Sequence, residues 1–139
     1  MVRFDQSEFR WLILPADLRS LPEFLEFVVQ GGKDAGFSEE RLWKLELASE
    51  EAVVNVIRYA YRLRDDRLIS LRMEGLRKCV RMRLRDYGEK VFPHEMKGRS
   101  HDLIKPGGLG LHLIRYAFDR VDYIHKPRGT ELVLTKNLA

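Results

Sequence analysis

Polar and apolar residues alternate over five segments of the chain, a period of two that predicts β-strands. In the first of them Phe9, Trp11 and Ile13 share one side, and in the third Val80 and Met82 share a face opposite a row of arginines. Such alternation is typical of a sheet with one packed and one solvated face. The five predicted strands are residues 8–14, 68–74, 78–86, 121–124 and 130–135.

Apolar residues at a spacing of three to four predict three helices. The first covers residues 18–35, where two glycines weaken its end. Ser38 is a favourable N-cap and is followed by two glutamates, so a second helix begins there. No Gly or Pro interrupts it before about Tyr61. A third helix follows the glycines at 107–110 and runs to Asp119.

The element order is strand, two helices, two strands, a long loop, a helix and two strands. This order predicts an α+β two-layer sandwich, with a mixed or antiparallel sheet covered on one face by about three helices. Residues 87–106 contain Gly, Pro and many charges without a clean period. A loop of this length inside a compact domain is typical of a functional segment.

Composition narrows the class of protein. The chain has 139 residues, 45% of them hydrophobic and 33% charged, which excludes collagen-like and disordered chains. Its one cysteine, Cys79, cannot form an internal disulfide. No apolar run is long enough to span a membrane, and the start lacks the pattern of a secretory signal. We therefore expect a single domain over residues 1–139 that is soluble and cytoplasmic.

The net charge of +4 is distributed unevenly. Residues 62–85 contain nine basic and three acidic side chains, a balance of +6, which leaves −2 for the rest of the chain. Three interpretations of this basic segment remain open. It is a solvated sheet face, a surface that binds an acidic protein through residues such as Arg81 and Arg83, or a surface that binds nucleic acid.

The second predicted helix contains a carboxylate and a carboxamide one turn apart. Glu51 and Asn55 lie side by side at this spacing, whereas Glu50 is rotated away from Asn55. An amide oxygen can bind Mg²⁺ while a neighbouring carboxylate orients or deprotonates a nucleophile. The alternative is an exposed polar stripe on a surface helix.

Asp86 continues the inward parity of Val80, Met82 and Leu84, so its carboxylate is expected to point toward the core. A buried carboxylate needs hydrogen-bond donors, and the amino group of an adenine is one possible donor. Gly88 would let a flat ring approach the backbone closely. The alternative is an aspartate that caps a turn at the start of the loop.

Three glycines in four positions, Gly107, Gly108 and Gly110, precede the third helix. Backbone N–H groups in such a segment can approach an oxyanion, and the helix dipole favours negative charge there. The spacing matches neither the phosphate loop of P-loop enzymes nor the dinucleotide fingerprint. The four histidines show no metal-ligand spacing.

Taken together, EEAVVN (50–55), DYG (86–88), GGLGL (107–111) and GTELVLTK (129–136) resemble the histidine-kinase-like ATPase superfamily. Within it, the chain is similar to the stand-alone anti-sigma factor serine kinases over nearly its whole length. One departure is Lys90, which stands where the D-x-G-x-G motif has its second glycine.

The resemblance implies ATP and Mg²⁺ as cofactors, bound under a lid at about 87–106. It assigns Mg²⁺ to Asn55, the role of general base to Glu51, and the adenine amino group to Asp86. The further residues that it assigns to ATP binding are Gly88, Gly107, Gly108, Leu109, Gly110, Leu111 and Thr130. Lys105 and Arg99 are assigned by position alone to the γ-phosphate.

The resemblance also implies partners. Such kinases bind a sigma factor and release it when an antagonist with a sulfate-transporter-like (STAS-type) domain binds instead, and they phosphorylate a serine on that antagonist. A homodimer is expected, with no direct contact to nucleic acid or membrane. Two alternatives remain: a module that regulates a partner by sequestration only, and a component of a larger signalling assembly with the same fold.

Overall fold

The computed structural model describes residues 9–64, 66–88 and 106–138, with 106–111 as backbone only. Five antiparallel strands form one sheet in the order β1-β2-β3-β5-β4. The strands are β1 (Phe9–Pro15), β2 (Leu68–Gly75), β3 (Cys79–Asp86), β4 (Arg120–His125) and β5 (Thr130–Asn137). The predicted two-layer α+β fold is confirmed, and its sheet is antiparallel throughout the described strands.

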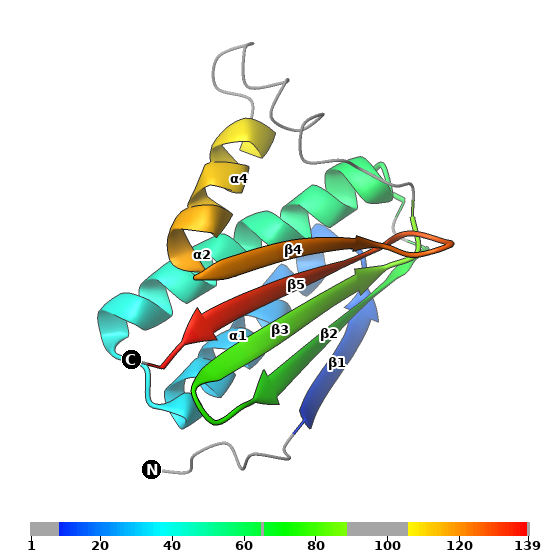
Figure 1. Ribbon diagram of the computed structural model, residues 1–139. Coiled ribbons are helices and arrows are strands. Elements are labelled where there is room, and N and C mark those ends of the chain that lie inside the picture. Colours follow the sequence, from blue (N-terminus) through cyan, green and yellow to red (C-terminus); the bar gives the residue numbers. More distant parts are fainter. Residues whose placement is uncertain (1–8, 65, 89–105, 139) are drawn as a thin grey trace.

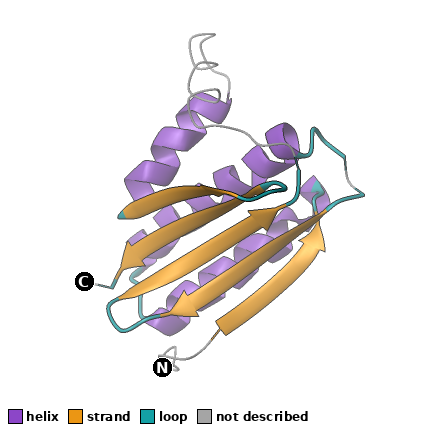
Figure 2. Ribbon diagram, turned by 45° about the vertical axis from the view of Figure 1, so that its right-hand side comes forward, coloured by secondary structure: helices purple, strands orange, loops and turns teal. Residues whose placement is uncertain are grey.

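In the part of the chain that the structure describes, three α-helices form the second layer: α1 (Leu21–Ala35), α2 (Glu39–Asn55) and α4 (Pro106–Ala117). They lie on one side of the sheet, and the other side carries no helix in the described part of the chain (Figures 1 and 2). Within these residues, none of the helices has the length and hydropathy needed to cross a bilayer.

The inner face of the sheet carries the residues that the alternation predicted. Ile69, Leu71 and Met73 of β2 and Val80 and Met82 of β3 are each 3% exposed or less. They pack against buried residues of the helices to form one hydrophobic core. The β2–β3 register, in which Leu71 faces Leu84 and Met73 faces Met82, places these residues on the same face.

The apolar row of β1 lies on the opposite, solvated face. Phe9, Trp11 and Ile13 are all more than half exposed, whereas Leu12 and Leu14 pack against the core. The two rows of β1 are both apolar, so alternation alone does not tell which row is buried. The ring faces of Phe9 and Trp11 lie 4.2 and 5.0 Å from the Arg72 guanidinium.

The glycines of the first helix do not end it. Gly31 and Gly32 are buried within α1, and a Cβ added at Gly32 would lie 2.6 Å from the Leu42 side chain on α2. The small residues therefore let α1 and α2 approach closely. Gly36 ends α1 with a φ of 93°, a left-handed conformation that favours glycine.

The second helix begins as predicted and changes form before its predicted end. The hydroxyl of Ser38 accepts a hydrogen bond from the Arg41 N–H at 3.4 Å, which confirms the N-cap. After Asn55 the chain forms a single π-helical turn, Val56–Ala60. π-Helical turns are rare and occur frequently at functional sites.

The outer face of the sheet is a network of arginines around one buried acid. Glu74 is only 5% exposed, and its carboxylate pairs with Arg72 at 3.0 Å, Arg83 at 2.8 Å and Arg81 at 3.9 Å. Arg83 also binds Glu131 at 2.8 Å. Most of the positive charge on this face is therefore matched within the face itself, and Arg81 is the member held at the greatest distance.

Candidate active site

Glu51 and Asn55 occupy the last turns of α2 and are not an exposed polar stripe. Asn55 is 8% exposed. In the described residues, Glu51 Oε2 and Asn55 Nδ2 are buried without a hydrogen-bond partner. The core side of the helix is filled by residues such as Leu45, Ala52 and Val53. Glu51 Oε2 and Asn55 Nδ2 are therefore two buried polar atoms, separate from the core side of the helix, that the described part of the chain leaves unsatisfied.

The environment of Glu51 strengthens it as a base. Burial raises the pKa of the Glu51 carboxyl above its usual value, and the neighbouring charge of Glu50 adds to this. Arg58 acts in the opposite direction by stabilising the carboxylate. Arg58, which is exposed, was not singled out by the motifs. Its spacing of seven residues from Glu51, two helical turns, is the signal that could have identified it.

Asp86 points inward from the end of β3, as its parity predicts. It is 4% exposed, and its carboxylate accepts a hydrogen bond from the Gly88 N–H at 3.0 Å. Burial raises the pKa of Asp86, and the backbone N–H groups of Gly88 and Thr130 together with the charge of Arg85 lower it in part. The hydrogen bond that caps the turn is therefore present, and the carboxylate that accepts it is also buried.

Thr130 is brought beside Asp86 by the sheet, because the two residues are register partners on β5 and β3. Its hydroxyl oxygen is also buried without a partner in the described residues. The set of such orphaned side-chain atoms comprises Glu51 Oε2, Asn55 Nδ2, Thr130 Oγ1 and Arg72 Nε. The last lies 3.0 Å from Glu74, so the other three are the unsatisfied ones, and all three belong to the predicted site.

Gly88 sits where no side chain fits. A Cβ at this position would lie 2.3 Å from the carbonyl oxygen of Ala60, the last residue of the π-helical turn. The close approach joins the segment after β3 to the segment after α2. The end of β3 and the C-terminal end of α2 accordingly meet at one edge of the molecule (Figure 1).

Tyr61 forms hydrogen bonds at the same contact between the segment after α2 and the segment after β3. Its hydroxyl accepts a hydrogen bond from the Tyr87 N–H at 2.8 Å and donates one to the Leu68 carbonyl at 2.7 Å. Tyr61 is 4% exposed, and burial raises the pKa of its hydroxyl. The residue therefore fixes the Asp86–Gly88 turn relative to the helix that carries Glu51 and Asn55.

Gly129 is a site-shaping residue whose role the motifs did not identify. It has a φ of 77°, and a Cβ there would lie 2.2 Å from the carbonyl oxygen of Asp86. Its position in the β4–β5 hairpin, after a proline and an arginine, is the sequence signal for a turn glycine. Only glycine lets the hairpin close against the end of β3.

The glycine-rich segment is helical, which corrects the expected turn. Helix α4 begins at Pro106, so Gly107, Gly108, Leu109, Gly110 and Leu111 lie in its first turns. Proline is favoured at the first helical position, which places the start there. The first backbone N–H groups of a helix have no partner within it. These residues thus still present amide donors at the N-terminal end of α4.

Part of the predicted site falls outside the described residues. This applies to Lys105 and Arg99, to the departure at Lys90, and to most of the expected lid at 87–106. Gly88 and Pro106 mark the two ends of the segment between β3 and α4. The remaining assigned residues are all in the described part, although those at 107–111 are described by backbone alone.

The residues present fit ATP with Mg²⁺. A carboxylate and an amide on neighbouring turns supply the oxygen donors that Mg²⁺ prefers. Asp86 is a buried acceptor suited to an amino group, and the Gly88 N–H holds one oxygen of its carboxylate. The orphaned atoms of Glu51, Asn55 and Thr130 are explained if a ligand completes their hydrogen bonds.

Similar proteins were found among curated sequences. The serine-protein kinase RsbW of Listeria monocytogenes serotype 4a (strain HCC23) is 30% identical over 111 residues, which cover 73% of this chain and 69% of that protein. The serine-protein kinase RsbW of Staphylococcus aureus (strain MRSA252) is 28% identical over 112 residues, with the same coverage of both chains.

A solved structure has the same fold. The crystal structure of the RsbU and RsbW domains of Rv1364c from Mycobacterium tuberculosis aligns with a TM-score of 0.66 and 16% identity, over 94% of this chain and 32% of that chain. Residues 14–136 match the histidine kinase-like ATPase domain. This match runs from the end of β1 to the next-to-last residue of β5 and includes every residue of the candidate site. The chain therefore belongs to the histidine kinase-like ATPase domain family.

Proposed function

We propose that the protein is an ATP- and Mg²⁺-dependent serine kinase that acts as an anti-sigma factor. It would sequester a sigma factor and phosphorylate a serine on the STAS-type antagonist of that complex. The observation that carries the proposal is that Glu51 Oε2, Asn55 Nδ2 and Thr130 Oγ1 are buried and unsatisfied within the described residues, and that Thr130 is the register partner of the buried Asp86. The similarity to serine-protein kinases of the RsbW type supports the choice of reaction and of partners.

In the proposed complex each residue has a defined task. Asp86 accepts a hydrogen bond from the adenine amino group, and the Gly88 N–H orients the Asp86 carboxylate for this contact. Asn55 holds Mg²⁺ through its amide oxygen, and the amide groups at the start of α4 face the phosphates. When bound, Mg²⁺ supplies neutralisation of the charge on the phosphate oxygens.

The proposed reaction transfers the γ-phosphoryl group to the serine oxygen of the partner. Glu51 accepts the proton of the serine hydroxyl as the new P–O bond forms and the bond to ADP breaks. The raised pKa of Glu51 suits this role, because a carboxylate that binds a proton more readily is a better base. The positive charge of Arg58 stabilises the Glu51 carboxylate and so offsets part of the rise in its pKa.

The substitution Glu51→Gln tests the reaction. The variant keeps the shape of the side chain and is expected to bind Mg-ATP with nearly unchanged affinity. Its phosphotransfer to the antagonist should fall by about 100- to 10,000-fold, the usual contribution of a general base. Phosphoserine formation is measured by mass spectrometry after incubation with the antagonist and ATP.

Glu46→Gln is the matched control, because Glu46 is an exposed acid on the same helix, α2, and does not contribute to the pKa shift of Glu51. It should retain the wild-type rate. If Glu51→Gln also retains that rate, Glu51 is not the base. If the wild type binds the sigma factor and ATP but transfers no phosphate, regulation is by sequestration only, and the kinase proposal is wrong.

A further inference from the structure

A cavity of about 250 Å³ lies beside Gly88 and outside the set Glu51, Asn55, Asp86 and Thr130. It opens where the π-helical turn, the connection to β2 and the β4–β5 hairpin come together at the right of Figure 1. Its lining residues are Ala60, Tyr61, Arg62, Arg64, Arg67, Tyr87, Gly88 and Arg128.

The lining of this cavity is strongly basic. It includes four arginines, and none of the described residues that line it is acidic. Arg64 and Arg67 share one carboxylate, Asp66, at 3.5 and 3.8 Å, and that carboxylate is itself 61% exposed. Two guanidinium groups carry ten N–H donors, far more than a single distant carboxylate can satisfy. Within the described residues, Arg64 and Arg67 therefore have N–H donors beyond those that face Asp66.

The backbone holds part of this cluster in a fixed turn. Arg62 and Leu63 have φ values of 49° and 64°, which are uncommon for residues other than glycine. The Leu63 N–H donates to the Ile57 carbonyl at 2.8 Å, and the Arg64 N–H donates to the Tyr61 carbonyl at 3.0 Å. The turn after α2 is thus hydrogen-bonded at both of its ends, which limits the positions open to its arginines.

The opposite wall is also fixed. Arg128 Nε donates to the Tyr87 carbonyl at 3.2 Å, and the Arg128 carbonyl accepts a bond from Arg85 at 2.9 Å. The Arg85 guanidinium lies 4.1 Å from the centre of the Tyr87 ring. The hairpin arginine is therefore anchored to the segment that follows Asp86, so the cavity has two defined sides.

We propose that this cavity binds a small ligand through its phosphate groups. Guanidinium groups match phosphate oxygens with paired hydrogen bonds and are the side chains best suited to this recognition. Tyr87 adds an aromatic residue to the lining. The shared chemistry is a phosphate chain, which an inorganic phosphate or a second nucleotide can supply.

Binding here is expected to influence the nucleotide site, a part of the proposal that rests on the proposed function. Tyr87 and Gly88 line the cavity and continue directly from Asp86. A ligand that holds these two residues alters the freedom of the turn that would contact adenine. The coupling is reciprocal, so ATP should change the affinity for the phosphate ligand by the same factor.

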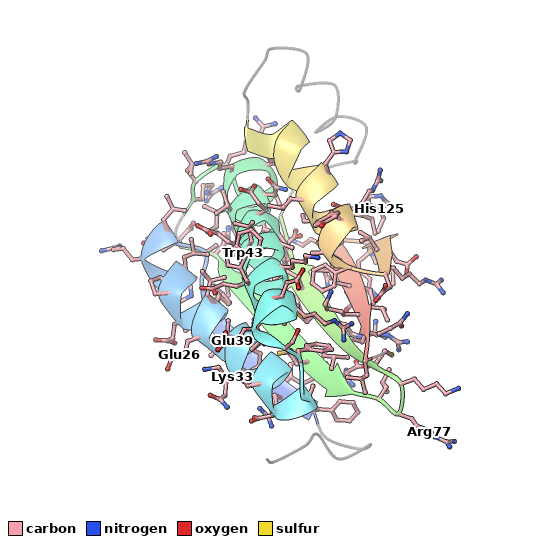
Figure 3. All side chains as sticks on the ribbon, turned by 90° about the vertical axis from the view of Figure 1, so that its left-hand side faces the viewer. Glu26, Lys33, Glu39, Trp43, Arg77 and His125 are labelled. Atoms are coloured by element: carbon pink, nitrogen blue, oxygen red, sulfur yellow. The ribbon has the colours of Figure 1, made fainter. Side chains whose placement is uncertain are left out.

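The test is an NMR titration of the ¹⁵N-labelled protein with sodium pyrophosphate in the absence of magnesium. We expect amide shifts at residues 61–64, 87–88 and 128, and roughly tenfold weaker binding in Arg64→Gln, which removes one charge-assisted contact. Arg77→Gln is the matched control, because Arg77 lies at the tip of the β2–β3 hairpin (Figure 3). The spectrum reports folding of each variant directly.

A parallel titration with GTP distinguishes a nucleotide from inorganic phosphate as the source of the phosphate groups. Binding of GTP that is tighter than that of pyrophosphate, and equally sensitive to Arg64→Gln, identifies a nucleotide as the ligand. Equal affinity of Arg64→Gln and Arg77→Gln overturns the site. So do shifts confined to Glu51, Asn55 and the start of α4, because they assign the anion to the ATP site alone and leave the proposed function intact.

Discussion

Glu51, Asn55 and Thr130 each bury a polar atom that has no partner in the described residues. An unsatisfied buried group lowers stability by about 1–3 kcal/mol. Three such atoms are therefore a large cost for a small domain, whose total stability is about 5–15 kcal/mol. A ligand that completes these bonds recovers that free energy, which is the physical reason to place the nucleotide here.

Asp86 gives the ligand-free protein a characteristic pH dependence. Its folded-state pKa is raised above 3.8, so the folded state binds the proton more tightly than the unfolded state. Stability is therefore lost as the pH rises through the interval between the two pKa values. We expect the melting temperature of the wild type, relative to Asp86→Asn, to fall as the pH rises above about 4, the ordinary range of an aspartate. A difference that stays constant as the pH rises contradicts the buried carboxylate.

At the scale of elements, the site depends on a junction between the end of α2 and the end of β3. The π-helical turn delivers Ala60 against Gly88 and Tyr61 against Tyr87. A continuous α-helix through Tyr61 would rotate these contacts, because each residue of an α-helix turns the chain by a fixed angle. The irregular turn thus aligns the helix that carries Glu51 with the strand that carries Asp86.

Tyr61→Phe tests this junction. The variant leaves the Tyr87 N–H and the Leu68 carbonyl without their partner, which should destabilise the protein by about 1–3 kcal/mol. ATP affinity should fall with it, because the Asp86–Gly88 turn is less well held. Thermal unfolding and calorimetry measure the two effects. Tyr116→Phe, at a 70% exposed tyrosine, is the control, and an equal effect of both variants would remove Tyr61 from this role.

The alternation of β2 and β3 and the Ser38 cap were predictable, because each rests on local rules of period and capping. Three features were not. The exposed row of β1 consists of large apolar residues, the glycines within α1 serve contact with α2, and the π-helical turn has no local signature. Each of these depends on a tertiary neighbour that the local sequence does not reveal.

The residues of the candidate site also divide into those that local rules predict and those that depend on tertiary contacts. The inward position of Asp86 followed from strand parity, and the pairing of Glu51 with Asn55 followed from helical spacing. The roles of Gly129 and Tyr61 did not follow, because they arise where the β4–β5 hairpin and the end of α2 meet β3. Motif spacing identifies residues that contact a ligand more readily than those that position them.

At the scale of the whole molecule, the two faces differ in charge. The helical layer exposes glutamates, including Glu26 and Glu39, together with Trp43 (Figure 3). The sheet exposes an arginine network and the apolar row of β1. A face that combines half-exposed aromatic residues with basic ones is typical of a protein interface.

Charge-reversal substitutions on the sheet face distinguish a role of this face in partner binding from a role in the stability of the fold. Arg81 is held by one ion pair of 3.9 Å, so Arg81→Glu should weaken binding of the sigma factor without changing ATP affinity. Arg83 lies between Glu74 and Glu131, so Arg83→Glu places three carboxylates together and should lower the melting temperature. Pull-down and thermal unfolding measure these effects. Loss of ATP affinity in Arg81→Glu would show that the face is structural.

The central claim is that Asp86 and Asn55 belong to a magnesium-dependent ATP site. Isothermal titration calorimetry of ATP, with and without Mg²⁺, into the wild type and Asp86→Asn tests it most directly. We expect binding to the wild type that is strengthened by Mg²⁺ and lost in the variant. Absence of binding to the wild type, or equal binding to both proteins, would contradict the site and with it the proposed kinase.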